Sequence, residues 1–159
     1  LIFANLPSLD YIDFHFYPLK LGDQTFFPKL MATIEAVKKT DPKKEIVISE
    51  LWLYKHPASG PNGVFDKSSH AANSYEFWSP LDIRFLQLMT NLAKAKGISV
   101  IAPYFPQYFF ADSQLEGNAP LPPWPNSLLG EWKRAFSGSG NLSPTGAGFR
   151  QIIKSKSMH

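Results

Sequence analysis

The segment that decides the fold is Lys44–Trp52, whose sequence is Lys-Glu-Ile-Val-Ile-Ser-Glu-Leu-Trp. Its run of β-branched residues predicts a buried strand, yet the run ends at a carboxylate, Glu50. A charged side chain is almost never buried without a partner, and the apolar neighbours of Glu50 supply none. Such a residue is tolerated where parallel strands end and ligands bind, so Glu50 is a candidate for a functional site. The alternative is an exposed Glu on an edge strand.

Alternation along this strand predicts which side chains accompany Glu50. One face of an alternating strand would hold Ile46, Ile48, Glu50 and Trp52, and the other Val47, Ser49 and Leu51. We therefore expect Glu50 and Trp52 to point together into the site, as a carboxylate beside an aromatic platform. Ser49 is expected to face the other way.

The composition of the 159 residues is that of one folded domain, because 44% of the residues are hydrophobic and 14% are aromatic. The formal net charge is only +3, and the one dense basic cluster lies at Lys38–Lys44 around a turn, which argues against nucleic-acid binding. The absence of cysteine excludes disulfides and cysteine-based metal sites. No apolar run suits a membrane span, and no signal segment is evident. Because the chain begins with Leu1, we expect a processed protein or part of a longer one.

Strand and helix patterns alternate along the whole chain. The predicted strands are Leu9–Tyr17, the segment through Glu50, and Ile98–Tyr104. The predicted helices are Thr25–Lys39, a helix from Ser79 to a cap at Gly97, a short helix at Leu128–Phe136, and Pro144–Lys154. This βαβαβα order predicts parallel strands joined by right-handed crossovers.

Three parallel strands alone would leave two open edges and little cover. Long loops at about residues 53–79 and 106–127 follow the second and third strands, whereas the segments before the strands are short. A (β/α)8 barrel with its site at the C-terminal face has this asymmetry. We therefore predict an α/β chain that forms the last three βα units of such a barrel over residues 1–159, incomplete by itself.

The first strand contributes polar side chains to the same end of the sheet. Alternation places Tyr11, Asp13, His15 and Tyr17 on one face, opposite Ile12, Phe14 and Phe16. His15 and Tyr17 then lie about 5 Å, one strand spacing, from the strand of Glu50. The phenol can donate a hydrogen bond to an ionised Glu50, and His15 can bind a ligand hydroxyl. Asp13 is expected to pair with a polar group inside the barrel.

Three short motifs together resemble a known family. His-Phe-Tyr ends the first strand, Ile-Val-Ile-Ser-Glu ends the second, and Leu-Ser-Pro-Thr-Gly precedes the last helix. In this order and spacing they resemble strands six, seven and eight of clan A glycoside hydrolases, most of all the cellulase-like family five. The resemblance implies a retaining glycosidase in which Glu50 is the nucleophile. It also implies that His15 and Tyr17 surround the nucleophile, and that Tyr104 is a candidate for the aromatic residue under the sugar. With Trp52, which alternation places beside Glu50, these are the residues predicted to bind the carbohydrate substrate, and neither a cofactor nor a metal is expected.

The chain also departs from the family pattern. The acid/base Glu of the family follows an Asn on strand four, and neither that strand nor an Asn-Glu pair occurs here. A retaining glycosidase needs two carboxyl groups about 5 to 5.5 Å apart. The expected partner is therefore the missing N-terminal barrel portion, or another chain that completes the sheet. The family's strand-eight Trp has only Tyr104 and Phe105 as counterparts.

Two other interpretations remain open. The first is a carbohydrate-binding or scaffold protein that keeps the barrel and performs no chemistry. The second is a self-contained small α/β domain that binds another ligand. A metal pair at Asp13 and His15 is disfavoured, because no second histidine cluster accompanies it. No location is assigned to the protein, although the resemblance fits a secreted one.

Overall fold

A computed structural model describes residues 5–18, 25–53, 78–104, 106–110 and 140–156. The chain divides into two compact units. The first comprises Leu1–Tyr54 and Leu88–Tyr104, and the second comprises Lys55–Gln87 and Phe105–His159. The predicted helix at Leu128–Phe136 and most of both predicted long loops lie outside the described residues.

The order of the described elements confirms the predicted alternation. Along the chain they are β1 (Tyr11–Phe16), α1 (Phe26–Thr40), β2 (Glu45–Leu51), α3 (Ser79–Lys96), β3 (Val100–Pro103), the 3-10 helix η3 (Pro106–Phe109) and α6 (Pro144–Lys156). η3 lies within a segment that was predicted to be loop.

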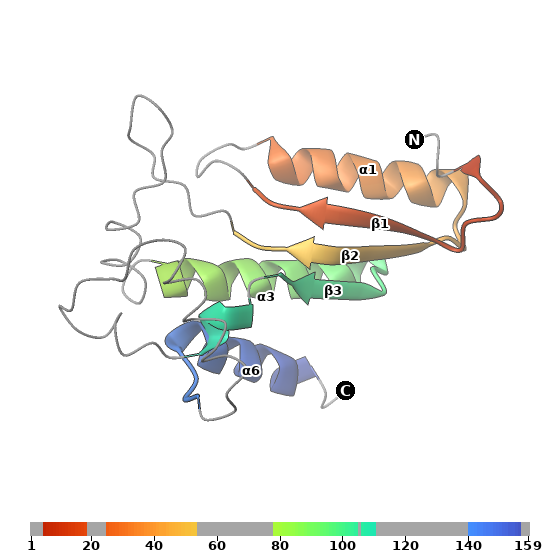
Figure 1. Ribbon diagram of the computed structural model, residues 1–159. Coiled ribbons are helices and arrows are strands. Elements are labelled where there is room, and N and C mark those ends of the chain that lie inside the picture. The colour runs from red at the N-terminus through yellow and green to blue at the C-terminus, as the bar shows by residue number, and fades with distance from the viewer. Residues whose placement is uncertain (1–4, 19–24, 54–77, 105, 111–139, 157–159) are drawn as a thin grey trace, which may run out of the picture. The chain divides into compact units, whose positions relative to one another are not determined.

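The three strands form one parallel sheet in the order β1-β2-β3, and Figure 1 shows β2 between its two neighbours. The predicted parallel α/β arrangement is therefore confirmed at this level. Among the described residues, β1 and β3 each pair on one side only. A parallel sheet of three strands with two such edges is small for its class.

Helix α1 covers one face of the sheet. Its apolar residues Leu30, Ile34 and Val37 recur at helical spacing and are buried. The ring of Phe27 meets that of Phe16 of β1 edge to face, with centroids 5.3 Å apart. The sheet residues Ile46, Ile48 and Leu51 are fully buried, and each such side chain contributes about 1.5 to 3 kcal/mol relative to exposure.

Helix α3 ends at the predicted glycine cap. Gly97 has a φ of 63°, in the left-handed region that only glycine adopts without cost. The next amide, Ile98 N–H, donates to Ala93 O at 2.9 Å, which completes a Schellman motif. This cap reverses the chain at once, so that β3 begins three residues later, at Val100.

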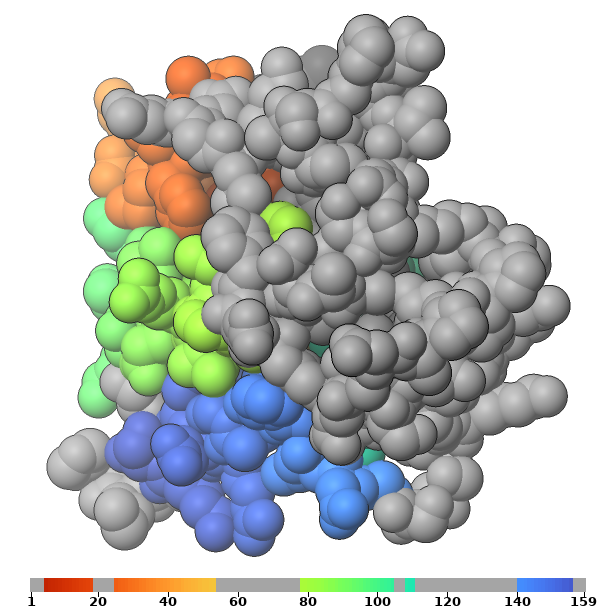
Figure 2. All heavy atoms as spheres, turned by 90° about the vertical axis from the view of Figure 1, so that its left-hand side faces the viewer, coloured from red at the N-terminus to blue at the C-terminus, as the bar shows by residue number. Residues whose placement is uncertain are grey.

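In the second unit, α6 begins at a serine cap and packs closely on its neighbours. Ser143 Oγ accepts from Gly146 N–H at 3.1 Å and donates to Tyr108 O. The rings of Phe109 and Phe149 stack at 4.8 Å. The atoms of α6, blue in Figure 2, lie directly against the first half of α3, light green, where Gly148 leaves room for Ile83.

Candidate functional site

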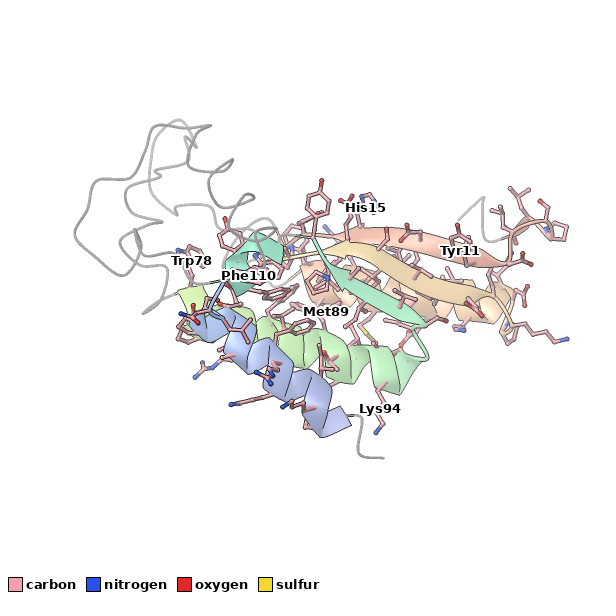
Figure 3. The ribbon with its side chains drawn as sticks, turned by 60° about the horizontal axis from the view of Figure 1, so that its bottom comes forward. Tyr11, His15, Trp78, Met89, Lys94 and Phe110 are labelled. Carbon is pink, nitrogen blue, oxygen red and sulfur yellow. The ribbon has the colours of Figure 1, made fainter. Side chains whose placement is uncertain are left out.

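The two faces of β1 differ as its sequence predicts. Tyr11, Asp13 and His15 are exposed, whereas Phe16 is buried. Because Phe16 contacts α1, the exposed residues lie on the face that looks away from this helix. Figure 3 shows the labelled side chains of Tyr11 and His15 on that outer face.

Between two successive pairs, strand β2 contains one residue more than the neighbouring strand, both toward β1 and toward β3. Along β1 the pairing runs from Asp13↔Val47 to His15↔Glu50, which is two steps on β1 and three on β2. Toward β3 it runs from Ile48↔Ile101 to Leu51↔Pro103, again two steps against three on β2. Ser49 is the residue common to both insertions, so β2 carries a β-bulge centred on Ser49.

Because of the bulge, the residues that share a face of β2 differ from those predicted. Paired residues share a face, so Glu50 lies with His15 on the outer face. Leu51 pairs with the buried Phe16 and is itself fully buried, together with Ile46 and Ile48. The prediction that Glu50 shares a face with Ile46 and Ile48 is therefore wrong, because the extra residue reverses the alternation between them.

The bulged residue is held by the neighbouring strand. Ser49 N–H donates to Asp13 Oδ1 at 2.9 Å, and Ser49 Oγ donates to Asp13 Oδ2 at 2.5 Å. Asp13 thus does pair with a polar group on the outer face, whereas the expectation that Ser49 points away from that face is wrong. Burial tends to raise the pKa of Asp13, but the Ser49 hydrogen bonds and nearby His15 outweigh it and hold that pKa below 3.8.

His15, Tyr17 and Glu50 form one cluster, as predicted from their positions at the strand ends. Tyr17 Oη donates to Glu50 Oε2 at 2.9 Å. His15 Nδ1 lies 3.2 Å from the same oxygen. The side chains of His15 and Glu50 are 57% and 28% exposed, so a ligand in solution can reach both groups.

The phenol of Tyr17 stays protonated in this environment. Desolvation raises its pKa well above the ordinary value of 10.0, and the hydrogen bond to Glu50 and the charge of that carboxylate raise it further. Tyr17 therefore remains a hydrogen-bond donor at neutral pH and can orient the carboxylate of Glu50.

Two aromatic residues of the predicted site differ in exposure. Tyr104 follows β3, is 47% exposed and meets Tyr17 edge to face, with centroids 6.1 Å apart at 90°. Trp52 is only 2% exposed, so its ring does not form the open platform that alternation predicted. The described aromatic surface beside Glu50 therefore comes from the two tyrosines.

Two described aromatic residues, Trp78 and Phe109, belong to the second unit. The indole of Trp78 is buried, and the half-buried ring of Phe109 stacks on that of Phe149. His56 and His70 lie outside the described residues, as do Tyr54 and Trp124. Within the described ranges no three His, Cys, Asp or Glu side chains come together as metal ligands. No described helix is long and apolar enough to cross a membrane.

Comparisons with protein-family models, with curated proteins and with solved structures found no match in any of the three. The geometry of the cluster and the motifs in the sequence are therefore the features that bear on function.

Proposed function

We propose that this chain supplies strands six to eight of a (β/α)8-barrel glycoside hydrolase and that Glu50 is the nucleophile of a retaining reaction. The observation that carries the proposal is the carboxylate of Glu50 at the end of a parallel strand, in contact with Tyr17 and His15 through one oxygen. The C-terminal ends of parallel strands are where barrel enzymes place their catalytic groups.

The exposure of residues on the outer face of the sheet supports the barrel proposal. Tyr11, Val100 and Tyr104 are about half exposed there, although parallel sheets are normally covered on both faces. In a barrel this face lines the interior, and the unpaired sides of β1 and β3 continue into further strands. Those strands come from an N-terminal portion of the protein or from another chain.

The proposed reaction proceeds in two steps. An oxygen of ionised Glu50 attacks the anomeric carbon, and the departing glycosidic oxygen takes a proton from a carboxylic acid on the completing part of the barrel. Water, deprotonated by that same carboxylate, then attacks the anomeric carbon and releases Glu50. Tyr17 and His15 both contact Oε2, so Oε1 is the attacking atom in this mechanism.

His15 and Tyr104 are the proposed contacts for the substrate. The exposed imidazole of His15 can hydrogen-bond a sugar hydroxyl through Nε2 while Nδ1 lies against Glu50. Tyr104 offers a half-exposed ring on which the apolar face of a sugar can stack. The mechanism requires neither metal nor cofactor.

Replacing Glu50 by Gln in the intact protein tests the proposal. The amide keeps the size of the side chain but cannot act as a nucleophile, so turnover of a susceptible glycoside should fall by several orders of magnitude. Glycan binding should be largely retained. His15→Ala should have a smaller effect, because this residue binds and orients without forming the covalent bond.

The matched control is Glu45→Gln, which removes an exposed carboxylate at the start of the same strand. This variant should keep wild-type turnover. Near wild-type turnover of Glu50→Gln would disprove the nucleophile assignment. Glycan binding by a wild-type protein that hydrolyses no glycoside would instead favour a carbohydrate-binding protein on the same fold.

A further inference from the structure

The bulge in β2 leaves the N–H and the hydroxyl of Ser49 available to donate hydrogen bonds outside the strand pairing. Ser49 is the extra residue in the pairing with both neighbours, and an extra residue of this kind lies outside the regular ladder. Its N–H and its hydroxyl both donate to the carboxylate of Asp13, one to each oxygen. Asp13 comes from the adjacent strand, 36 residues earlier in the chain.

We propose that Asp13 is a positioning residue for Glu50: its carboxylate holds the bulge at Ser49 and thereby sets the face of the sheet on which Glu50 lies. Its catalytic importance rests on the proposed function, in which Glu50 is the reacting group. Asp13 is assigned to act through Ser49, because the two hydrogen bonds from Ser49 affect its carboxylate more than the charge of His15 does.

The energetic reason lies in the opposite face of the strand. Without the extra residue, alternation would turn Glu50 toward the side of Ile46 and Ile48, which are fully buried. Burying an unpaired carboxylate there is strongly unfavourable. Hydrogen bonds to an ionised acceptor are stronger than those between neutral groups, so the bidentate contact with Asp13 favours the bulged register.

The position of Asp13 on an exposed part of the sheet fits this role better than a role in the core. Its side chain is exposed, and both of its carboxylate oxygens accept hydrogen bonds from Ser49 on the same face of the sheet. Substitution of Asp13 should therefore leave the packing of Ile46 and Ile48, which precede the bulge, intact and change the direction of the chain from Ser49 onward.

A coupling measurement tests the proposal without any assay of activity. Chemical denaturation of the Tyr17→Phe, Glu50→Ala and doubly substituted proteins gives the coupling between these two side chains. The same cycle is then measured in proteins that also carry Asp13→Ala, Asp13→Thr or Asp13→Asn. The matched control is Asp10→Ala, which removes an exposed carboxylate just before β1.

The coupling between Tyr17 and Glu50 should be largely lost with Asp13→Ala and with Asp13→Thr, since neither side chain places an oxygen at the position of Oδ1, which accepts from Ser49 N–H. It should persist with Asp13→Asn, whose amide oxygen still accepts from Ser49 N–H, and with the Asp10 control. Thr suits an exposed strand position and keeps the test available if the Ala variant does not fold. Full coupling in either the Ala or the Thr background would overturn the proposal.

Kinetics give a second, separate result. In the active protein, Asp13→Ala should lower kcat at least tenfold with little change in KM, and Asp13→Asn should restore most of it. An unchanged kcat in Asp13→Ala would also overturn the positioning role. A protein that hydrolyses no glycoside would refute the proposed function alone, because the coupling cycle is measured without substrate.

Discussion

Gly146, the third residue of α6, is predicted to be a position where even a methyl group is not tolerated. A Cβ built there would lie 2.0 Å from Phe109 O, 2.8 Å from Phe109 C and 3.0 Å from Phe109 Cα. All three are backbone atoms, so a rotamer change cannot relieve the overlap. The chain around η3 and the first turn of α6 would have to separate by more than 1 Å to restore ordinary contact distances.

The size of the effect follows from opposing contributions. Ala is favoured over Gly inside a helix by about 1 kcal/mol. Against this, overpacking costs about 1 to 3 kcal/mol, and moving Phe109 O endangers its 3.0 Å hydrogen bond from Ser143 N–H, worth about 0.5 to 1.5 kcal/mol. We therefore expect Gly146→Ala to destabilise the protein by about 1 to 3 kcal/mol.

Two other glycines provide controls of different kinds. At Gly148 the new methyl would meet Ile83 side-chain atoms at 2.6 and 2.7 Å, and these can rotate away, so the loss should be smaller. At Gly97 nothing lies within 4 Å, and the cost is the left-handed φ alone, about 1 to 2 kcal/mol. Chemical denaturation and amide exchange along α6 measure the effect. Stability of Gly146→Ala equal to or above wild type would refute the reasoning.

Two further predictions concern Tyr17 and the sheet edges. In an ultraviolet titration, Tyr17→Phe should remove the signal of a tyrosine that ionises above pH 10.0. Because the pKa of Tyr17 is raised in the folded state, the contribution of the Tyr17 hydroxyl to stability is complete below pH 10.0. This contribution is lost as the pH rises toward the raised pKa. Loss of a normally titrating tyrosine would contradict this. The 159-residue chain alone should self-associate in sedimentation experiments through its unpaired strand edges, and Val100→Lys on the half-exposed β3 should reduce the association. A monodisperse, cooperatively melting monomer would count against the partial barrel.

The strands and helices could be predicted because their signals are local. Apolar spacing marks α1 at Leu30, Ile34 and Val37, and a glycine marks the end of α3 at Gly97. The convergence of His15, Tyr17 and Glu50 also followed from local information, because all three lie at the C-terminal ends of neighbouring parallel strands.

The faces of β2 could not be predicted in the same way. The bulge depends on hydrogen bonds between Asp13 and Ser49, and no pattern within β2 reports a partner that distant in the sequence. Alternation counted from Ile46 therefore placed Glu50 on the wrong face. Trp52 was likewise expected to be exposed, and the alternation of the strand does not account for its burial.

The inserted Ser49 allows one short strand both to fill the interior and to present a carboxylate on the opposite face. Before and after it, Ile48 and Leu51 fill the interior, while Glu50 between them faces the solvent. Evolution can therefore exchange the interior residues of β2 for other apolar ones without redirecting the carboxylate. It can equally alter the surroundings of Glu50 without disturbing the interior. Gain or loss of a single codon at this point would change whether the strand presents a carboxylate on its outer face.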